Sequence, residues 1–157
     1  MEGFAVAVSK KERQGLVSLD AFLQEAFAEC KRNGYNLWGI YPLNNPFYSF
    51  ALKPISRDLK FCIGHCFGMI NKKVLTHIDY KEDYERSLRY AVRDGGVIRY
   101  NHTCAITRFG RKGGVDKTAK ERLPIYKKEI EYLLQEFPTA LRLNPKREGE
   151  ILLKRRI

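Results

Sequence analysis

A helix followed at once by a strand is the feature that most constrains the fold. Between residues 18 and 34, apolar side chains recur at intervals of three and four, at Leu19, Phe22, Leu23, Ala26, Phe27 and Cys30, the spacing of one helical face. Ser18 can cap the first turn, and Gly34 can end the helix. The next apolar run, Leu37 to Tyr41, is rich in β-forming residues and ends at Pro42. The chain must therefore pack an amphipathic helix against a core that contains strands.

More helices and strands are predicted in the remaining sequence. The expected helices are 81–93 and 124–137, the expected strands are 61–70 and 97–109, and the tail, 141–157, is expected to form two short strands around Asn144-Pro145. Residues 3–8 are interpreted as an edge strand or as the remnant of something longer. We therefore expect one α+β domain over residues 1–157, in which 18–156 form a mixed β-sheet packed by about three helices and 1–17 are peripheral.

Alternation along the strand 97–109 divides its side chains between two faces. The apolar face holds Ile98, Tyr100, His102, Cys104 and Ile106, and the polar face holds Arg99, Asn101, Thr103 and Thr107. We expect the first face to lie in the core and the second to be open to a ligand. His102, and His65 in the strand 61–70, are interpreted as core histidines because their neighbours are apolar.

The charge balance indicates the class of partner. Twenty-nine Lys and Arg residues against eighteen Asp and Glu give a net charge of +11, which attracts polyanions, above all the phosphates of nucleic acids. DNA is therefore the expected partner, although a basic surface that binds nothing in particular remains the alternative. No apolar run is long enough to cross a membrane, and charged residues crowd positions 1–14, so we expect a cytoplasmic protein without a membrane partner.

Four cysteines are too few for a disulfide scaffold in a chain of this length, and we expect reduced, mostly buried thiols. A zinc site at Cys62, His65 and Cys66 is disfavoured. In a strand, His65 would face away from the two cysteines, and the sequence offers no convincing second pair of ligands.

Two constellations of residues can carry chemistry. The first is the acidic start of the helix 81–93, where Glu82, Asp83 and Glu85 follow Lys81. A carboxylate there can act as a general base or hold a divalent metal, Mg²⁺ or Mn²⁺. The alternative is helix capping with surface ion pairs, Glu82–Arg86 and Glu85–Arg89.

The second constellation is the polar face of the strand 97–109 with the loop after it. Arg99 and Asn101 lie on that face, and Arg111, Lys112, Gly113 and Gly114 follow in the loop. Arginine offers a planar donor fork for phosphate, and glycine allows close backbone approach. We expect these residues, together with Lys81, to bind phosphate or nucleic acid, with a solvated strand face and an ordinary loop as the alternative.

Several segments, read in order, resemble one family. They are 37–47 (LWGIYPLNNPF), 61–71 (FCIGHCFGMIN), 81–90 (KEDYERSLRY), 94–101 (DGGVIRYN), Gly113-Gly114 and 136–138 (EFP). In this order they resemble the glycosyltransferases associated with TET/JBP-type base-oxidising enzymes, which are found widely in phages and large viruses. The resemblance covers about 18–156 and implies the C-terminal, acceptor-side half of a GT-A-like fold, acting in the host cytoplasm if the protein is viral.

The family's activity implies roles for the two constellations. It is the transfer of a sugar from a nucleotide-diphosphosugar to a hydroxylated base in DNA. Asp83, with Glu82, would then deprotonate the acceptor hydroxyl, while Arg99, Asn101 and the loop 111–114 would face phosphates or the acceptor.

The sequence departs from the family in one respect. It has no Asp-x-Asp motif, which in the family binds the metal and the sugar diphosphate, and no nucleotide-binding half before residue 18. We therefore expect a split-gene product with an N-terminal nucleotide-binding partner, a truncated reading frame, or a descendant with a changed activity. The alternative is a small nucleic-acid-binding protein or a metal-dependent nuclease, with Glu82, Asp83 and Glu85 as metal ligands and Lys81 neutralising charge.

Overall fold

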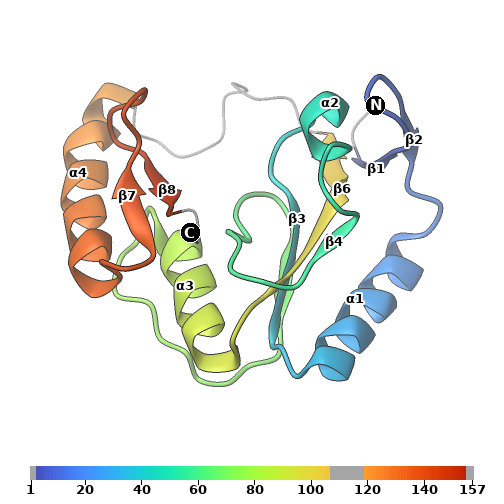
Figure 1. Ribbon diagram of the computed structural model, residues 1–157, viewed down its shortest axis with the longest axis horizontal. Helices are drawn as coiled ribbons and strands as arrows, with labels where there is room; N and C mark the ends of the chain where they lie inside the picture. The colour runs from blue at the N-terminus through green and yellow to red at the C-terminus, as the bar shows by residue number, and fades with distance from the viewer. Residues whose placement is uncertain (1–2, 107–118, 155–157) are drawn as a thin grey trace.

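A mixed six-stranded sheet with helices on both faces forms the centre of the molecule (Figure 1). The structure is a computed structural model that describes residues 3–106 and 119–154. Its strands are β1 (Gly3–Ala7), β2 (Arg13–Gly15), β3 (Leu37–Tyr41), β4 (Ile55–Ser56), β5 (Phe67–Met69), β6 (Ile98–Ile106), β7 (Leu141–Leu143) and β8 (Ile151–Leu153). Its helices are α1 (Leu19–Asn33), α2 (Pro46–Ser49), α3 (Glu82–Asp94) and α4 (Ala119–Glu136). The predicted α+β class is confirmed.

Strand β6 joins the two halves of the main sheet. The strand order is β2-β1-β6-β3-β5, and β4 also pairs with β6. Within this sheet, β3 and β6 run parallel, whereas the other pairs are antiparallel. A parallel pair needs a long crossover, which here contains α3. Strands β7 and β8 form a separate hairpin, as predicted for the tail.

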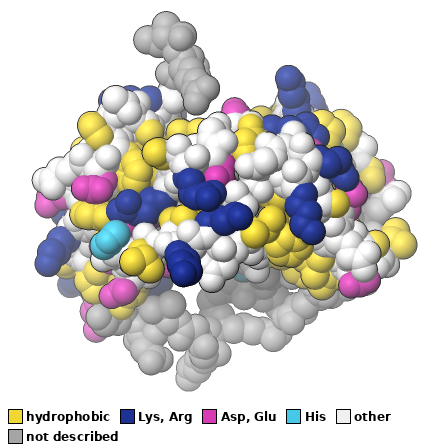
Figure 2. Space-filling view, turned by 90° about the horizontal axis from the view of Figure 1, so that it is seen from below, with side chains coloured by type: hydrophobic (Ala, Val, Ile, Leu, Met, Phe, Trp, Pro, Cys, Tyr) yellow, Lys and Arg dark blue, Asp and Glu magenta, His cyan; other side chains and the backbone are white. Residues whose placement is uncertain are grey.

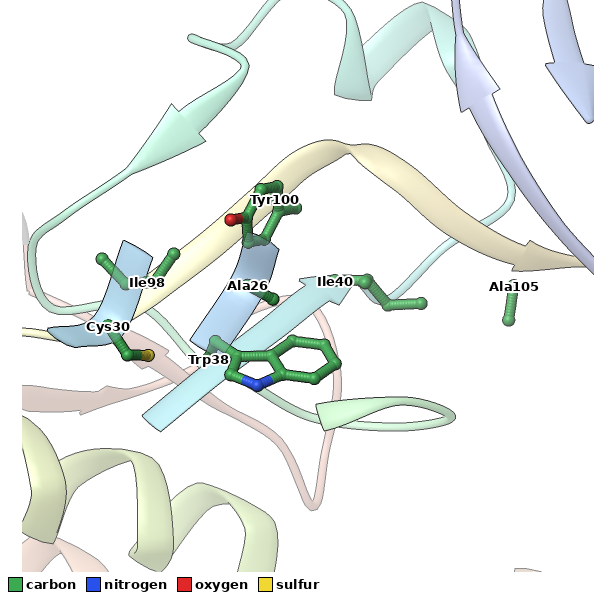
Figure 3. Packing of buried hydrophobic residues seen from close by; sticks show 7 residues of the cluster. All are labelled: Ala26, Cys30, Trp38, Ile40, Ile98, Tyr100 and Ala105. Atoms are coloured by element: carbon green, nitrogen blue, oxygen red, sulfur yellow. The ribbon is translucent and has the colours of Figure 1, made fainter. Parts of the chain in front are cut away.

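Helix α1 covers one face of the main sheet and buries Trp38, the only tryptophan in the sequence. Trp38 packs in a cluster of buried residues from α1, β3 and β6 that also holds Ala26, Cys30, Ile40, Ile98, Tyr100 and Ala105 (Figure 3). The rings of Phe22 and Phe27 meet the indole edge-on, each with ring centroids 5.7 Å apart. Both helix ends are as predicted, because Ser18 accepts the N–H of Ala21 and Gly34 adopts φ 70°.

Helix α3 packs on the opposite face, with α4 and the β7–β8 hairpin beyond it (Figure 1). One buried cluster joins the sheet to α3 and consists of Leu37, Cys62, Tyr90, Ala91 and Val97. A second joins α3 to α4 and the hairpin and consists of Leu88, Ile130, Leu133, Leu141 and Ile151. Within the described residues, no helix is both long and apolar enough to cross a bilayer.

The predicted strand 61–70 forms only at Phe67–Met69. The residues before this strand turn toward α3, whose side chains accept hydrogen bonds from their backbone N–H groups. The N–H of Cys62 donates to Ser87 Oγ at 2.9 Å, and the N–H of Gly64 donates to the Asp83 carboxylate at 3.3 Å. His65 is exposed rather than buried in the core, contrary to the prediction.

Two other predictions, the position of the first strand in the sheet and the start of the last helix, are wrong. Residues 3–7 are not an edge strand, because β2 pairs with them on the side away from β6. Helix α4 begins at Ala119, so Pro124 lies inside it rather than in the first turn. The helix continues across Pro124, although the proline lacks the N–H for one helical hydrogen bond and its ring crowds the carbonyl four residues earlier.

The alternation predicted for 97–109 breaks within β6. The pairing of β6 with β3 jumps from Ile40–Tyr100 to Tyr41–Cys104, and Ala105 joins Tyr100 in the core cluster. The opposite face is not open, because Asn101 and Thr103 are only 0% and 5% exposed. His102 is partly exposed, stacks on Phe50 and places Nε2 2.9 Å from the carbonyl oxygen of Leu52.

Gly68 is required where β5 crosses Trp38. A Cβ atom at Gly68 would lie 2.4 Å from the indole nitrogen, whereas one at Gly15 would meet nothing within 4 Å. Since Trp38 is held by two other rings, Gly68→Ala should lower the free energy of unfolding by about 1 to 3 kcal/mol. Gly15→Ala should leave it unchanged or raise it by about 0.4 to 1 kcal/mol. Urea unfolding of both variants checks this, and equal stabilities would contradict the packing described here.

Candidate active site

The candidate site lies where strand β3 ends and α3 begins, beside the first residues of the parallel strand β6. Because α3 runs antiparallel to both strands before leading into β6, its first turn lies toward their carboxyl ends (Figure 1). In open α/β sheets, ligands bind at this edge. The first turn of α3 contains the predicted acidic residues Glu82, Asp83 and Glu85.

Asp83 is half-buried at this edge. Its two carboxylate oxygens accept the N–H groups of Gly64, at 3.3 Å, and of Tyr84, at 2.9 Å. Burial, and after it the negative charge of Glu82, raise the pKa of Asp83 above its usual range. A raised pKa brings a carboxylate closer to the value that suits a general base at neutral pH. Gly64 adopts φ 89°, a conformation that favours glycine.

Lys81 lies beside Asp83 but is enclosed by aromatic rings. Its ammonium is 4.9 Å from the ring centroid of Tyr84 and 4.4 Å from that of Tyr126. Burial lowers the pKa of Lys81, although Asp83, Glu150 and Glu129 oppose this shift. The structure therefore places Lys81 in cation–π contacts with two tyrosine rings, and its phosphate binding stays a prediction.

Glu85 is a structural residue, which corrects its prediction as a catalytic group or metal ligand. Its side chain is 0% exposed. Its carboxylate accepts hydrogen bonds from the backbone N–H groups of His77 and Ile78, from Arg89 Nε and from Tyr132 Oη. Burial alone would raise the pKa of Glu85, but these bonds outweigh it and hold the pKa below its usual range.

The three carboxylates at the start of α3 do not converge. Glu82 pairs with Arg86 at 3.5 Å, Asp83 faces Gly64, and Glu85 points into the protein. Across residues 3–106 and 119–154, no group of three His, Cys, Asp or Glu side chains is arranged to hold a metal ion. At Cys62, burial raises the pKa of the thiol to about 12, so the thiol is protonated at neutral pH.

Arg99 is the second functional candidate, and Asn101 positions it. Arg99 Nε donates to Asn101 Oδ1 at 2.7 Å, and its guanidinium lies 5.6 Å from the ring centroid of Tyr41. Asn101 also donates to the carbonyl of Lys53 and to Ser56 Oγ, at 2.8 and 2.7 Å. Asn101 is thus a buried support and not the exposed ligand-binding residue that was predicted.

The terminal nitrogens of Arg99 have no bonding partner among the described residues. Burial lowers the pKa of Arg99, yet a guanidinium stays charged in proteins. No carboxylate pairs with it within the described ranges, 3–106 and 119–154. A partly buried cation of this kind can be compensated by an anionic ligand.

Asp83 and Arg99 lie on the same side of the sheet, separated by residues 62–64. Gly39 of β3 stands opposite Arg99 of β6, and a Cβ atom at Gly39 would lie 2.7 Å from Cys62 Cβ. Cys62 therefore lies over the sheet next to Arg99, while Gly64, two residues later, binds Asp83. No contact joins the two side chains directly. The loop residues Arg111, Lys112, Gly113 and Gly114, and also Thr107, lie outside the described residues.

Sequence reasoning missed Tyr41, Gly64, Tyr126 and Glu129. The buried Glu129 carboxylate of α4 accepts the N–H groups of Asp79, Tyr80 and Lys81 and so supplies the cap that Lys81 lacks. The only local signal was Gly64, because two glycines within seven residues weaken a strand prediction.

Comparison with protein-family models, with curated proteins and with solved structures gives no match for this chain. A function can be proposed from the positions of Asp83 and Arg99 and from the segments quoted above.

Asp83 and Glu85 should differ in how loss of their charge changes the stability of the protein. Glu85→Gln should destabilise the protein by about 3 to 5 kcal/mol at neutral pH, because it breaks a buried ion pair with Arg89. The folded pKa of Glu85 is lowered, so this contribution is present above pH about 4.3 and is lost as the pH falls further. Urea unfolding at several pH values measures it. Glu82→Gln is the matched control, with a change within about 0.5 kcal/mol.

Asp83→Asn should leave the free energy of unfolding unchanged or raise it. The folded pKa of Asp83 is raised, so its ionisation favours the unfolded chain, and this penalty grows as the pH rises above about 4. The variant should therefore match the unaltered protein at acid pH and equal or exceed it at pH 7. Asp20→Asn, in the first turn of α1, should instead lose a few tenths of a kcal/mol, roughly 0.3. A marked destabilisation by Asp83→Asn would contradict the environment described for this carboxylate.

Proposed function

We propose that this chain is the acceptor-side half of a glycosyltransferase that transfers a sugar from a nucleotide-diphosphosugar to a hydroxylated base in DNA. The observation that carries the proposal is Asp83, a half-buried carboxylate with a raised pKa, at the carboxyl edge of the parallel pair β3–β6. Arg99 adds a cation on the same side of the sheet, whose terminal nitrogens have no bonding partner in residues 3–106 and 119–154. The resemblance of the ordered segments supplies the reaction class.

Each residue has a role in the proposed transfer. Asp83 accepts the proton of the base's hydroxyl group as that oxygen attacks the anomeric carbon of the sugar. The bond from this carbon to the diphosphate breaks, and the nucleoside diphosphate leaves with the bonding electrons. Arg99 offers its two terminal nitrogens to a phosphate, either of the leaving diphosphate or of the DNA backbone.

The charge of the molecule suits a nucleic-acid substrate. The net charge is +11, and Lys and Arg side chains spread over the face shown in Figure 2, among apolar and a few acidic ones. Such a field accelerates the approach of DNA and makes its binding dependent on salt.

The three carboxylates at the start of α3 do not fit a divalent metal. Glu85 is buried with its oxygens bonded, and Glu82 pairs with Arg86, so these carboxylates do not form the Mg²⁺ or Mn²⁺ site that the nuclease alternative requires. The sequence contains no Asp-x-Asp. We therefore propose that the nucleotide-sugar donor, and any metal bound with it, is held by a nucleotide-binding partner outside residues 1–157.

Sugar transfer can be tested with the two halves together. The chain is mixed with the product of the neighbouring coding sequence, a nucleotide-sugar and DNA containing hydroxymethylated bases, and glycosylated nucleosides are measured by mass spectrometry. Asp83→Asn should lower the rate by about 10²- to 10⁴-fold, the usual contribution of general-base catalysis. Asp20→Asn, at an exposed helix start, should retain the full rate.

Two further results bear on the proposal. Arg99→Lys keeps the charge but loses the donor fork, so the KM of the phosphate-bearing substrate should rise. Full activity of Asp83→Asn would remove the assigned base. DNA binding that weakens with salt, without sugar transfer in any combination of chains, would leave a binding module in place of the transferase.

A further inference from the structure

Helix α2 carries two aromatic side chains on the outside of the protein. Phe47 and Tyr48 are 57% and 59% exposed, and every other aromatic side chain in residues 3–106 and 120–154 is buried or only partly exposed. Neighbouring Leu43 and Leu52 are exposed as well. An apolar patch of this kind on a protein surface marks a site of interaction.

The aromatic pair rests on a well-supported loop. Asn45 Oδ1 caps α2 by accepting the N–H of Phe47 at 3.1 Å, and Arg13 of β2 bonds to Asn44 just before it. On the inner side, Phe50 stacks on His102 of β6 with ring centroids 4.9 Å apart. The rings of Phe47 and Tyr48 stand edge to face, 5.3 Å apart. The pair is therefore held in place before any ligand arrives.

Cations surround this patch. Lys10 lies 5.9 Å from the ring centroid of Phe47, and the turn between β1 and β2 also carries Lys11 against a single acid, Glu12. Lys53 follows α2 and is exposed. Exposed flat rings beside lysines favour a ligand with both phosphates and flat apolar faces. An apolar segment of a protein would use the rings but not the cations.

The patch lies at the same edge of the sheet as the candidate active site. Helix α2 follows β3 after a short turn, and Figure 1 shows it near the upper ends of β3 and β6. Arg99 is tied to the end of the α2 segment through Asn101, which donates to the carbonyl of Lys53.

We propose that Phe47 and Tyr48 form a stacking platform for unpaired bases of a DNA strand, whose phosphates bind Lys10 and Lys53. This inference rests on the proposed function for its substrate, DNA, and specifies the form in which that substrate is recognised. The acceptor is bound as a single strand or with bases turned out of the duplex, since a paired base cannot present its face to a protein ring.

The test measures affinity by fluorescence anisotropy at one fixed salt concentration. The probes are a single-stranded oligodeoxynucleotide of about 12 nucleotides, the same strand with abasic sites, and the corresponding duplex. The variants are Phe47→Ala/Tyr48→Ala, Phe47→Leu/Tyr48→Leu and the control Leu75→Ala/Val92→Ala, which removes two exposed apolar side chains near α3. Thermal unfolding confirms that each variant is folded.

Both platform variants should bind the single strand about 5- to 150-fold more weakly, the effect of losing one stacked base. The affinity of both variants for the duplex should change little, and the control variant should bind every probe as the unaltered chain does. The unaltered chain should bind the abasic strand as weakly as the platform variants bind the normal strand. Full affinity of the leucine variant, or equal losses for single strand and duplex, would overturn the platform and leave the sugar-transfer assay unaffected. Failure of the unaltered chain to bind any of the DNA probes would overturn both the platform and the proposed DNA substrate.

Discussion

Parallel pairing of β3 with β6 places Trp38 opposite Ile98 and Gly39 opposite Arg99, and the remaining arrangement depends on it. Two parallel neighbours must be joined by a crossover, so α3 runs back along the sheet and begins near the strands' carboxyl ends. The same pairing buries one row of side chains under α1 and sets Arg99 on the opposite face. Without it, the carboxylate of Asp83 and the guanidinium of Arg99 would not lie on the same face of the sheet.

Buried glutamates hold the layers together around this pair. Glu29 binds Arg32 and Arg57 and so ties α1 to the segment after β4, with Arg32 the main cause of its lowered pKa. Glu85 binds Arg89 within α3 and accepts a hydrogen bond from Tyr132 of α4, and Glu129 holds the backbone before α3. These three buried glutamates therefore stabilise the packing of the layers. Asp83 differs from them because its carboxylate accepts only two backbone N–H groups, and burial raises its pKa.

Local signals predicted the parts of the fold that are fixed locally. Both ends of α1 were predictable because Ser18 and Gly34 act within one turn of the helix. The segment 61–66 was not, because its backbone partners, Ser87 and Asp83, come about twenty positions later. In the site, Asp83 and Arg99 were named from the sequence. The different roles of Asp83 and Glu85 could not be predicted, because they depend on how deeply each side chain is buried once α4 has packed, and no local sequence pattern shows this depth.

The Glu129 cap has a consequence for the order of folding. The donors it satisfies, at residues 79–81, are about fifty positions away along the chain, so the backbone directly before α3 gains these bonds only when α4 has docked. Contacts of such long sequence separation form late, because closing the intervening loop costs entropy first. During synthesis, the proposed base would therefore acquire its final surroundings only after most of the polypeptide has left the ribosome.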